Sequence, residues 1–150
     1  MKQIKKCLIL MLVSLWCISP HLKAQNDLQI SKAFEQYGQK NGAVMVELTN
    51  EVLGDYDFDL FKSLTITNNP QAAEFIRKCL AHDETGAKKV KQVIANGVPT
   101  SIYLQLPRKG KLSRLILFND TNKLEHKITL IYIESETDSE DILKFILKKK

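Results

Sequence analysis

The chain has 150 residues, a length typical of one domain, and 22 Lys and Arg against 17 Asp and Glu give it a formal net charge of +5. Six Gly, four Pro and three Cys are too few for collagen-like, low-complexity or disulfide-framework proteins. A small globular domain remains, and its composition does not indicate what it does.

The N-terminus has the three parts of a secretory signal peptide. Three lysines lie within the first six residues, an uncharged run follows over residues 7–19, and Ala24 offers a small residue for cleavage. The run is shorter than the roughly 20 residues of a membrane-spanning helix. We therefore expect cleavage after Ala24, with an uncleaved anchor as the alternative. Residues 1–24 are then the signal peptide, and residues 25–150 form one periplasmic or secreted domain without a stable membrane span.

Removing the signal peptide changes the charge and the cysteine count. The first 24 residues hold four lysines and no acidic residue, so residues 25–150 carry 18 basic and 17 acidic residues, a net charge of +1. The basic isoelectric point is therefore no sign of nucleic-acid binding, and we expect no nucleic-acid partner. Lipidation at Cys17 is not expected, because the bulky Trp16 precedes it. Cys79 is then the only cysteine left, so no intrachain disulfide can form.

The first half of the domain mixes helical and strand patterns. A helix is predicted over residues 27–40, with Asp27 as its cap and an apolar stripe at helical spacing. A buried strand is predicted over residues 43–48, one helical turn over 49–53 and a second strand over 63–67. A second helix runs from Pro70 to about His82, because proline suits the first helical position. Its expected buried stripe is Ala72, Phe75, Ile76, Cys79 and Leu80.

The second half predicts an antiparallel meander. Four strand-like runs cover residues 88–95, 100–106, 112–118 and 126–133. Asn96-Gly97 separates the first two and is a strong hairpin signal, since both turn residues need positive φ. The other loops are too short for parallel crossovers. The run over residues 112–118 is apolar on both sides, so we expect it in the centre of the sheet, and we expect the first two strands to extend the same sheet.

A closing helix is predicted over residues 138–147. Thr137 and Glu140 match a capping box, and Ile142, Phe145 and Ile146 form the expected apolar face. The element order indicates a single α+β domain, an antiparallel β-meander sheet with helices packed on one face.

The order of these segments resembles one group of proteins. A signal peptide ends in Ala-Gln, a helix ends in Phe34-x-x-Tyr37, and a Gly-Ala-Val-Met-Val-Glu-Leu-Thr strand follows at residues 42–49. An apolar segment with Leu60, Phe61, Leu64 and Ile66 and then the meander complete the pattern. Over residues 28–147 the chain resembles small exported Bacteroidetes proteins classed as a domain of unknown function. The resemblance implies this fold and localisation, and it implies no activity.

An acidic run and a Cys–His pair are the candidate metal-binding features. Asp55, Asp57 and Asp59 have the spacing that opens an EF-hand loop, but Leu60 and Ile66 stand where that loop needs Gly and Glu. A solvated acidic loop is therefore expected in place of a calcium site. Cys79 and His82 are three residues apart on one predicted helix and could serve as two metal ligands or as a nucleophile and its base. Cys79 also falls on the buried stripe, so we expect a core cysteine, with no metal and no cofactor.

Catalytic signatures are absent from the sequence. G-x-S-x-G, H-E-x-x-H and Gly-rich phosphate-loop motifs do not occur, and no catalytic residue is assigned. Acidic pairs such as Glu47 with Glu51, or Asp83 with Glu84, are compatible with glycosidase chemistry and equally with a solvated surface.

Charge is distributed unevenly along the chain. Residues 25–87 carry a net charge of −5, whereas residues 88–127 carry +7. Candidate binding residues for an anionic partner are Arg108, Lys109, Lys111 and Arg114. The alternative is protection of strand edges, because lysine on an exposed strand blocks pairing with other chains.

These observations favour an exported, non-enzymatic binding module of the cell envelope over an enzyme. Its partner is expected to be an envelope protein or an anionic envelope component. The alternative is a small envelope enzyme that uses carboxylates or Cys79.

Overall fold

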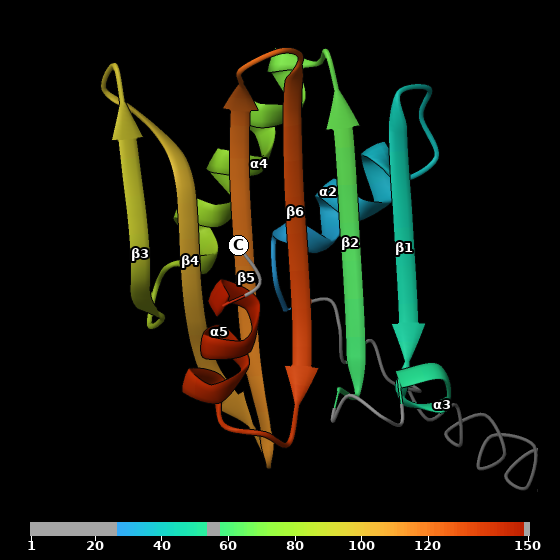
Figure 1. Cartoon of the computed structure of the whole chain (residues 1–150), viewed down its shortest axis with the longest axis vertical. Helices are drawn as coiled ribbons and strands as arrows, with labels where there is room; N and C mark the ends of the chain where they lie inside the picture. Colours follow the sequence, from blue (N-terminus) through green and yellow to red (C-terminus); the bar gives the residue numbers. More distant parts are fainter. Residues whose placement is uncertain (1–26, 54–57, 149–150) are drawn as a thin grey trace, which may run out of the picture.

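Six antiparallel strands form one open sheet in the computed structural model, which describes residues 27–53 and 58–148. The sheet order is β1-β2-β6-β5-β4-β3 (Figure 1). The strands are β1 (Ala43–Thr49), β2 (Leu60–Thr67), β3 (Lys88–Ala95), β4 (Val98–Lys109), β5 (Leu112–Asn122) and β6 (His126–Ser135). The described helices are α2 (Ile30–Tyr37), α3 (Asn50–Leu53), α4 (Pro70–Asp83) and α5 (Ser139–Lys148). The predicted α+β class is confirmed.

The meander from β3 to β6 has the predicted connections. Asn96 and Gly97 both have positive φ, 52° and 77°, as the predicted tight hairpin requires. β5 lies between β4 and β6, and six consecutive residues from Ser113 to Phe118 are buried. β1 and β2 extend the same sheet by pairing β2 with β6. The last strand of the chain is therefore an interior strand of the sheet.

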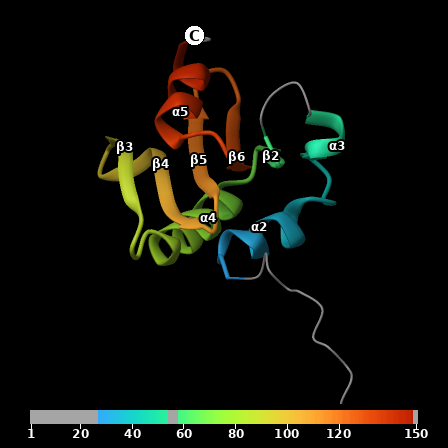
Figure 2. The ribbon, with the colours of Figure 1, turned by 90° about the horizontal axis from the view of Figure 1, so that it is seen from below.

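The two faces of the sheet carry different helices (Figure 2). Ile116 and Phe118 of β5 pack in the core under α2 and α4, whereas Leu115 and Leu117 pack with α5 on the opposite face. The expectation of helices on one face thus holds for α2 and α4 but not for α5. The physical reason is that β5 is apolar on both sides, so each side needs a cover.

Two predicted details at the surface of the fold are wrong. β1 is an edge strand with mostly exposed side chains, although its apolar run suggested burial. In α5, Ile142 is buried and Ile146 packs against the core as predicted, but Leu143 is buried in place of Phe145, which is 47% exposed. In both cases the neighbouring elements decide which apolar side chains are covered.

The helix caps differ from those that local spacing predicted. Asp27 does not cap α2, whose N-cap residue Gln29 makes no side-chain capping bond. Asp83, at the end of α4, instead accepts hydrogen bonds from the Gln29 N–H at 2.7 Å and the Ile30 N–H at 2.9 Å. In α5 the side chain of Asp138, and not that of Thr137, accepts from the Glu140 N–H. Asn69 caps α4 by accepting from the Ala72 N–H.

Candidate functional site

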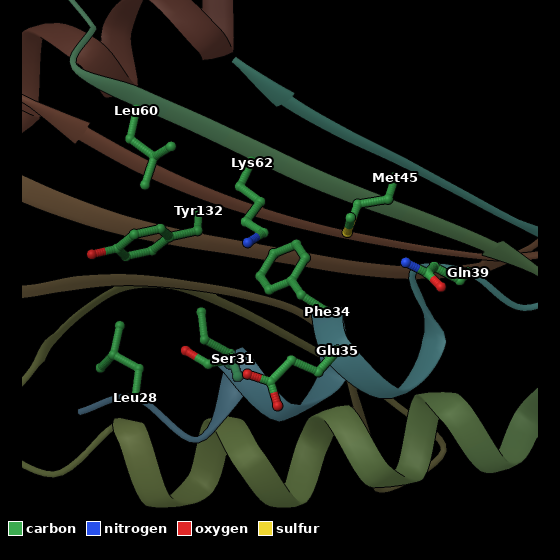
Figure 3. A pocket seen from close by; sticks show the side chains of 10 residues that line it. Leu28, Ser31, Phe34, Glu35, Gln39, Met45, Leu60, Lys62 and Tyr132 are labelled. Atoms are coloured by element: carbon green, nitrogen blue, oxygen red, sulfur yellow. The ribbon is translucent and has the colours of Figure 1, made fainter. Parts of the chain in front are cut away.

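A pocket of about 250 Å³ lies between α2 and the sheet, where α2 crosses β1, β2 and β6 (Figure 3). Half of its described lining residues are apolar, and the other half carry a polar group. The described lining residues are Leu28, Ile30, Ser31, Phe34, Glu35, Gln39, Met45, Leu60, Lys62 and Tyr132. They come from one short helix, the residues that flank it and three strands, so no single sequence motif contains them.

Lys62 supplies a positive charge in the wall of this pocket. It lies on β2 directly opposite Glu47 of β1, and its Nζ is 2.8 Å from a Glu47 carboxylate oxygen. The same Nζ lies 5.3 Å from the centre of the Phe34 ring, a distance suited to a cation–π contact. The Lys62 side chain is only 20% exposed. The ammonium is therefore held by two partners and still borders the cavity.

Tyr132 closes another side of the pocket and stays protonated. Its hydroxyl donates to a Glu134 carboxylate oxygen at 2.6 Å. Burial, together with this bond and the Glu134 charge, raises the pKa of the Tyr132 phenol far above its ordinary value of about 10. Arg114 lies next to this pair and opposes the rise. Tyr132 is therefore a hydrogen-bond donor in this site and not a general base.

The pocket suits noncovalent binding of an amphipathic molecule. Phe34, Met45 and Leu60 offer apolar contact area. Lys62 and Tyr132, which border the cavity, already have partners in the fold, so they can orient a ligand without needing one for stability. Such a combination of an apolar wall and a few placed polar groups is typical of small-ligand sites.

The four basic residues predicted to bind an anion all lie in the β4–β5 hairpin but in two environments. Arg108, Lys109 and Lys111 are exposed around the hairpin turn, where the Arg108 guanidinium donates to the Lys111 carbonyl at 2.6 Å. Arg114 is buried, forms an ion pair with Asp27 at 3.1 Å and donates to the Pro107 carbonyl. Arg114 thus ties the start of the described chain to the sheet beside Tyr132.

Cys79 and His82 do not converge on a common site. The predicted burial of Cys79 is confirmed, and burial followed by the Asp83 charge raises the pKa of its thiol. The His82 side chain is 72% exposed. Of the acidic run, Asp55 and Asp57 lie outside the described residues, and within residues 27–53 and 58–148 no cluster of three metal-binding side chains occurs. Asp83, one of the acidic candidates, is buried and engaged at the α2 N-terminus.

A polar cluster at the other end of the sheet was not predicted from the sequence. Asp120 accepts from the Arg77 guanidinium and lies 2.9 Å from His126 Nε2. Arg77 also donates to the Pro99 carbonyl at 2.8 Å. Asp120 and His126 share one face of the β5–β6 hairpin, a signal visible only once the strand register is known. The cluster ties α4 to the sheet.

A second hollow, of about 410 Å³, lies between α5 and the β3–β4 pair, on the face opposite α2. Val90, Leu143 and Leu147 form its apolar part.

No helix in the described part of the chain has the length and apolar character needed to cross a membrane.

Comparison with known proteins gives a family and no activity. The family of unknown function DUF6108 matches residues 17–146. No curated protein and no solved structure matches the chain. The match spans the sheet and nearly all of the helices described above, and the chain therefore belongs to the family of unknown function DUF6108.

Proposed function

We propose that the protein is an exported, non-enzymatic binding module of the cell envelope that holds a small amphipathic ligand in the pocket between α2 and the sheet. The observation that carries this proposal is the Phe34–Lys62 wall, an aromatic ring with an ammonium 5.3 Å from its centre. A ligand with an apolar body and one anionic end matches both groups. Export to the envelope rests on the signal peptide pattern of residues 1–24.

The state of the reactive groups supports binding over catalysis. Cys79 is absent from the described lining residues and is buried with a raised thiol pKa, which disfavours the nucleophilic thiolate. Asp83 is engaged in capping α2, and Glu47 is paired with Lys62. The Cys79 thiol and at least one carboxylate of each candidate acidic pair are thus already used in holding the fold.

The proposal is tested with 1-anilinonaphthalene-8-sulfonate, a fluorescent probe with an aromatic body and one anionic group. Lys62→Met keeps the apolar stem and removes the charge, so we expect the dissociation constant to rise about tenfold, as loss of one charged hydrogen bond implies. Ser31→Trp fills the pocket and should abolish binding. Lys78→Met is the matched control, because Lys78 is exposed on α4 and pairs with Glu74 away from the pocket.

Equal probe affinity in the parent and in both pocket variants would place the binding elsewhere and refute the proposal. Displacement of the probe by short fatty carboxylates, but not by uncharged alcohols of the same length, would identify the anionic end as the recognised group.

A further inference from the structure

The two edges of the sheet are protected to very different degrees. β3 carries Lys88, Lys89 and Lys91 among its eight exposed residues. β1, the opposite edge, has the sequence AVMVELT, and residues 41–61 contain no lysine or arginine. Lysine on an edge strand discourages pairing with another chain. Within residues 27–53 and 58–148 the sheet therefore has one edge protected by lysines and one edge without such protection.

The open edge presents apolar side chains and backbone groups together. Val44 is 64% exposed and Val46 is 39% exposed. Thr67 N–H donates to Gly42 O at 2.9 Å and Asn50 N–H donates to Asp59 O at 3.0 Å, which fixes the hydrogen-bonding phase of β1 against β2. Because this phase alternates along an antiparallel pair, the backbone groups of Met45 and Glu47 point away from β2.

We propose that β1 pairs antiparallel with β1 of a second copy of this chain, about a twofold axis at Val46, so that two six-stranded sheets become one continuous sheet. On one face of the strand the apolar pattern is symmetric about this residue, with Val44 before it and Leu48 after it. The twofold sets Val46 opposite Val46 and Val44 opposite Leu48 on one face. It sets Met45 opposite Glu47, the residues whose backbone groups point outward, so these form the hydrogen-bonded pairs.

The charges near the strand fit the same arrangement. Glu47 is already paired with Lys62 in its own chain at 2.8 Å, so its charge is compensated before a copy approaches. The twofold axis at Val46 places the C-terminal end of β1 beside the N-terminal end of β1 in the second copy. Glu51 follows the first of these ends and Lys40 precedes the other, so opposite charges come near each other. Pairing of β3 with a second β3 would instead bring six lysines onto one pair of strands. Charge therefore selects the β1 edge, and this inference stands apart from the ligand pocket.

The first test measures association by light scattering during size-exclusion chromatography, up to about 1 mM protein. The full chain is expressed, and the protein is purified in the form that remains after processing by the cells. We expect the mass to rise with concentration from one chain to two. Val46→Lys should raise the dissociation constant at least about tenfold, since the twofold axis would set the two lysine charges directly opposite each other. Val93→Lys is the matched control, an exposed valine on β3, and should leave association unchanged.

The second test examines the register. At a non-hydrogen-bonded antiparallel pair the Cα atoms are about 4.5 Å apart, which a disulfide can span. Val46→Cys should therefore give a disulfide-linked dimer under mild oxidation, with the parent, whose Cys79 is buried, as the background. Val44→Cys should not, because the two Val44 positions lie about four residues, or roughly 14 Å, apart along the pair.

Each contrary outcome overturns the proposal. A chain that stays monomeric at every concentration has no pairing through β1. If Val93→Lys weakens association as much as Val46→Lys does, the contact is head-to-tail, between β1 of one copy and β3 of the other. Cross-linking through Val44 in place of Val46 contradicts the twofold axis.

Discussion

The contact between Asp83 and the start of α2 offers the sharpest test of how this fold is held together. The Asp83 carboxylate accepts hydrogen bonds from the N–H groups of Gln29 and Ile30 at 2.7 and 2.9 Å, and Asp83 is 6% exposed. Asp83→Asn keeps the shape but removes the charge and turns an amide NH₂ toward one of these donors. One buried N–H then lacks a partner, which costs about 1–3 kcal/mol. The lost attraction between a negative charge and the helix N-terminus adds about 0.3–1 kcal/mol.

We therefore expect Asp83→Asn to lower the free energy of unfolding by about 1–4 kcal/mol, measured by urea denaturation with an unchanged slope. Glu74→Gln, an exposed change on the same helix, should stay within about 0.5 kcal/mol of the parent. Asp83→Asn should also lower the pKa of the Cys79 thiol, because the Asp83 charge is the second cause, after burial, that raises it. A variant as stable as the parent would refute the assignment of Asp83 as the cap of α2.

Four further predictions concern other parts of the chain. Cys79 should react with a thiol reagent in denaturant but only slowly in the native protein, since it is buried with a raised thiol pKa; rapid native labelling would contradict this. Gly97→Val should destabilise the protein by about 1–3 kcal/mol in a thermal melt, because Gly97 has φ of +77° while the space around it is open, so the cost is backbone strain alone. Stability should fall above about pH 10, since the native state holds the Tyr132 proton more tightly than the unfolded chain and loses that advantage as pH rises; the fall should be smaller in Tyr132→Phe, and equal curves would argue against it. We expect the protein isolated from cells to begin at Gln25, which intact mass decides, whereas a full-length chain held in the membrane would exclude cleavage after Ala24.

Local patterns in the sequence were enough to predict most of the elements. The Asn96-Gly97 turn needs positive φ at both residues, and the strands on either side alternate, so the hairpin could be predicted without any knowledge of its neighbours. Pro70 and the apolar stripe of α4 are equally local signals, and the burial of Cys79 followed from its place on that stripe. The double-sided apolar pattern of β5 placed it inside the sheet.

Predictions from local patterns were wrong where the burial of a side chain depends on an element distant in the sequence. The apolar run of β1 suggested a buried strand, yet its side chains are mostly exposed and no strand covers its outer side in the described part of the sheet. The closing helix was expected beside the others, but the second apolar side of β5 draws α5 to the opposite face. In both cases the sequence shows that a side chain is apolar, but it does not show which element will cover that side chain.

The candidate site and the α2 cap were decided by tertiary structure alone. Asp83 lies more than 50 residues from the amides that it caps, and the pocket joins Phe34 of a helix with Lys62 and Tyr132 of two strands. Helix and strand periodicity arises from bonds between near neighbours, so the sequence by itself determines it. The meeting of distant segments depends on sheet order and register, which arise from packing the whole chain at once, and only the folded structure determines them.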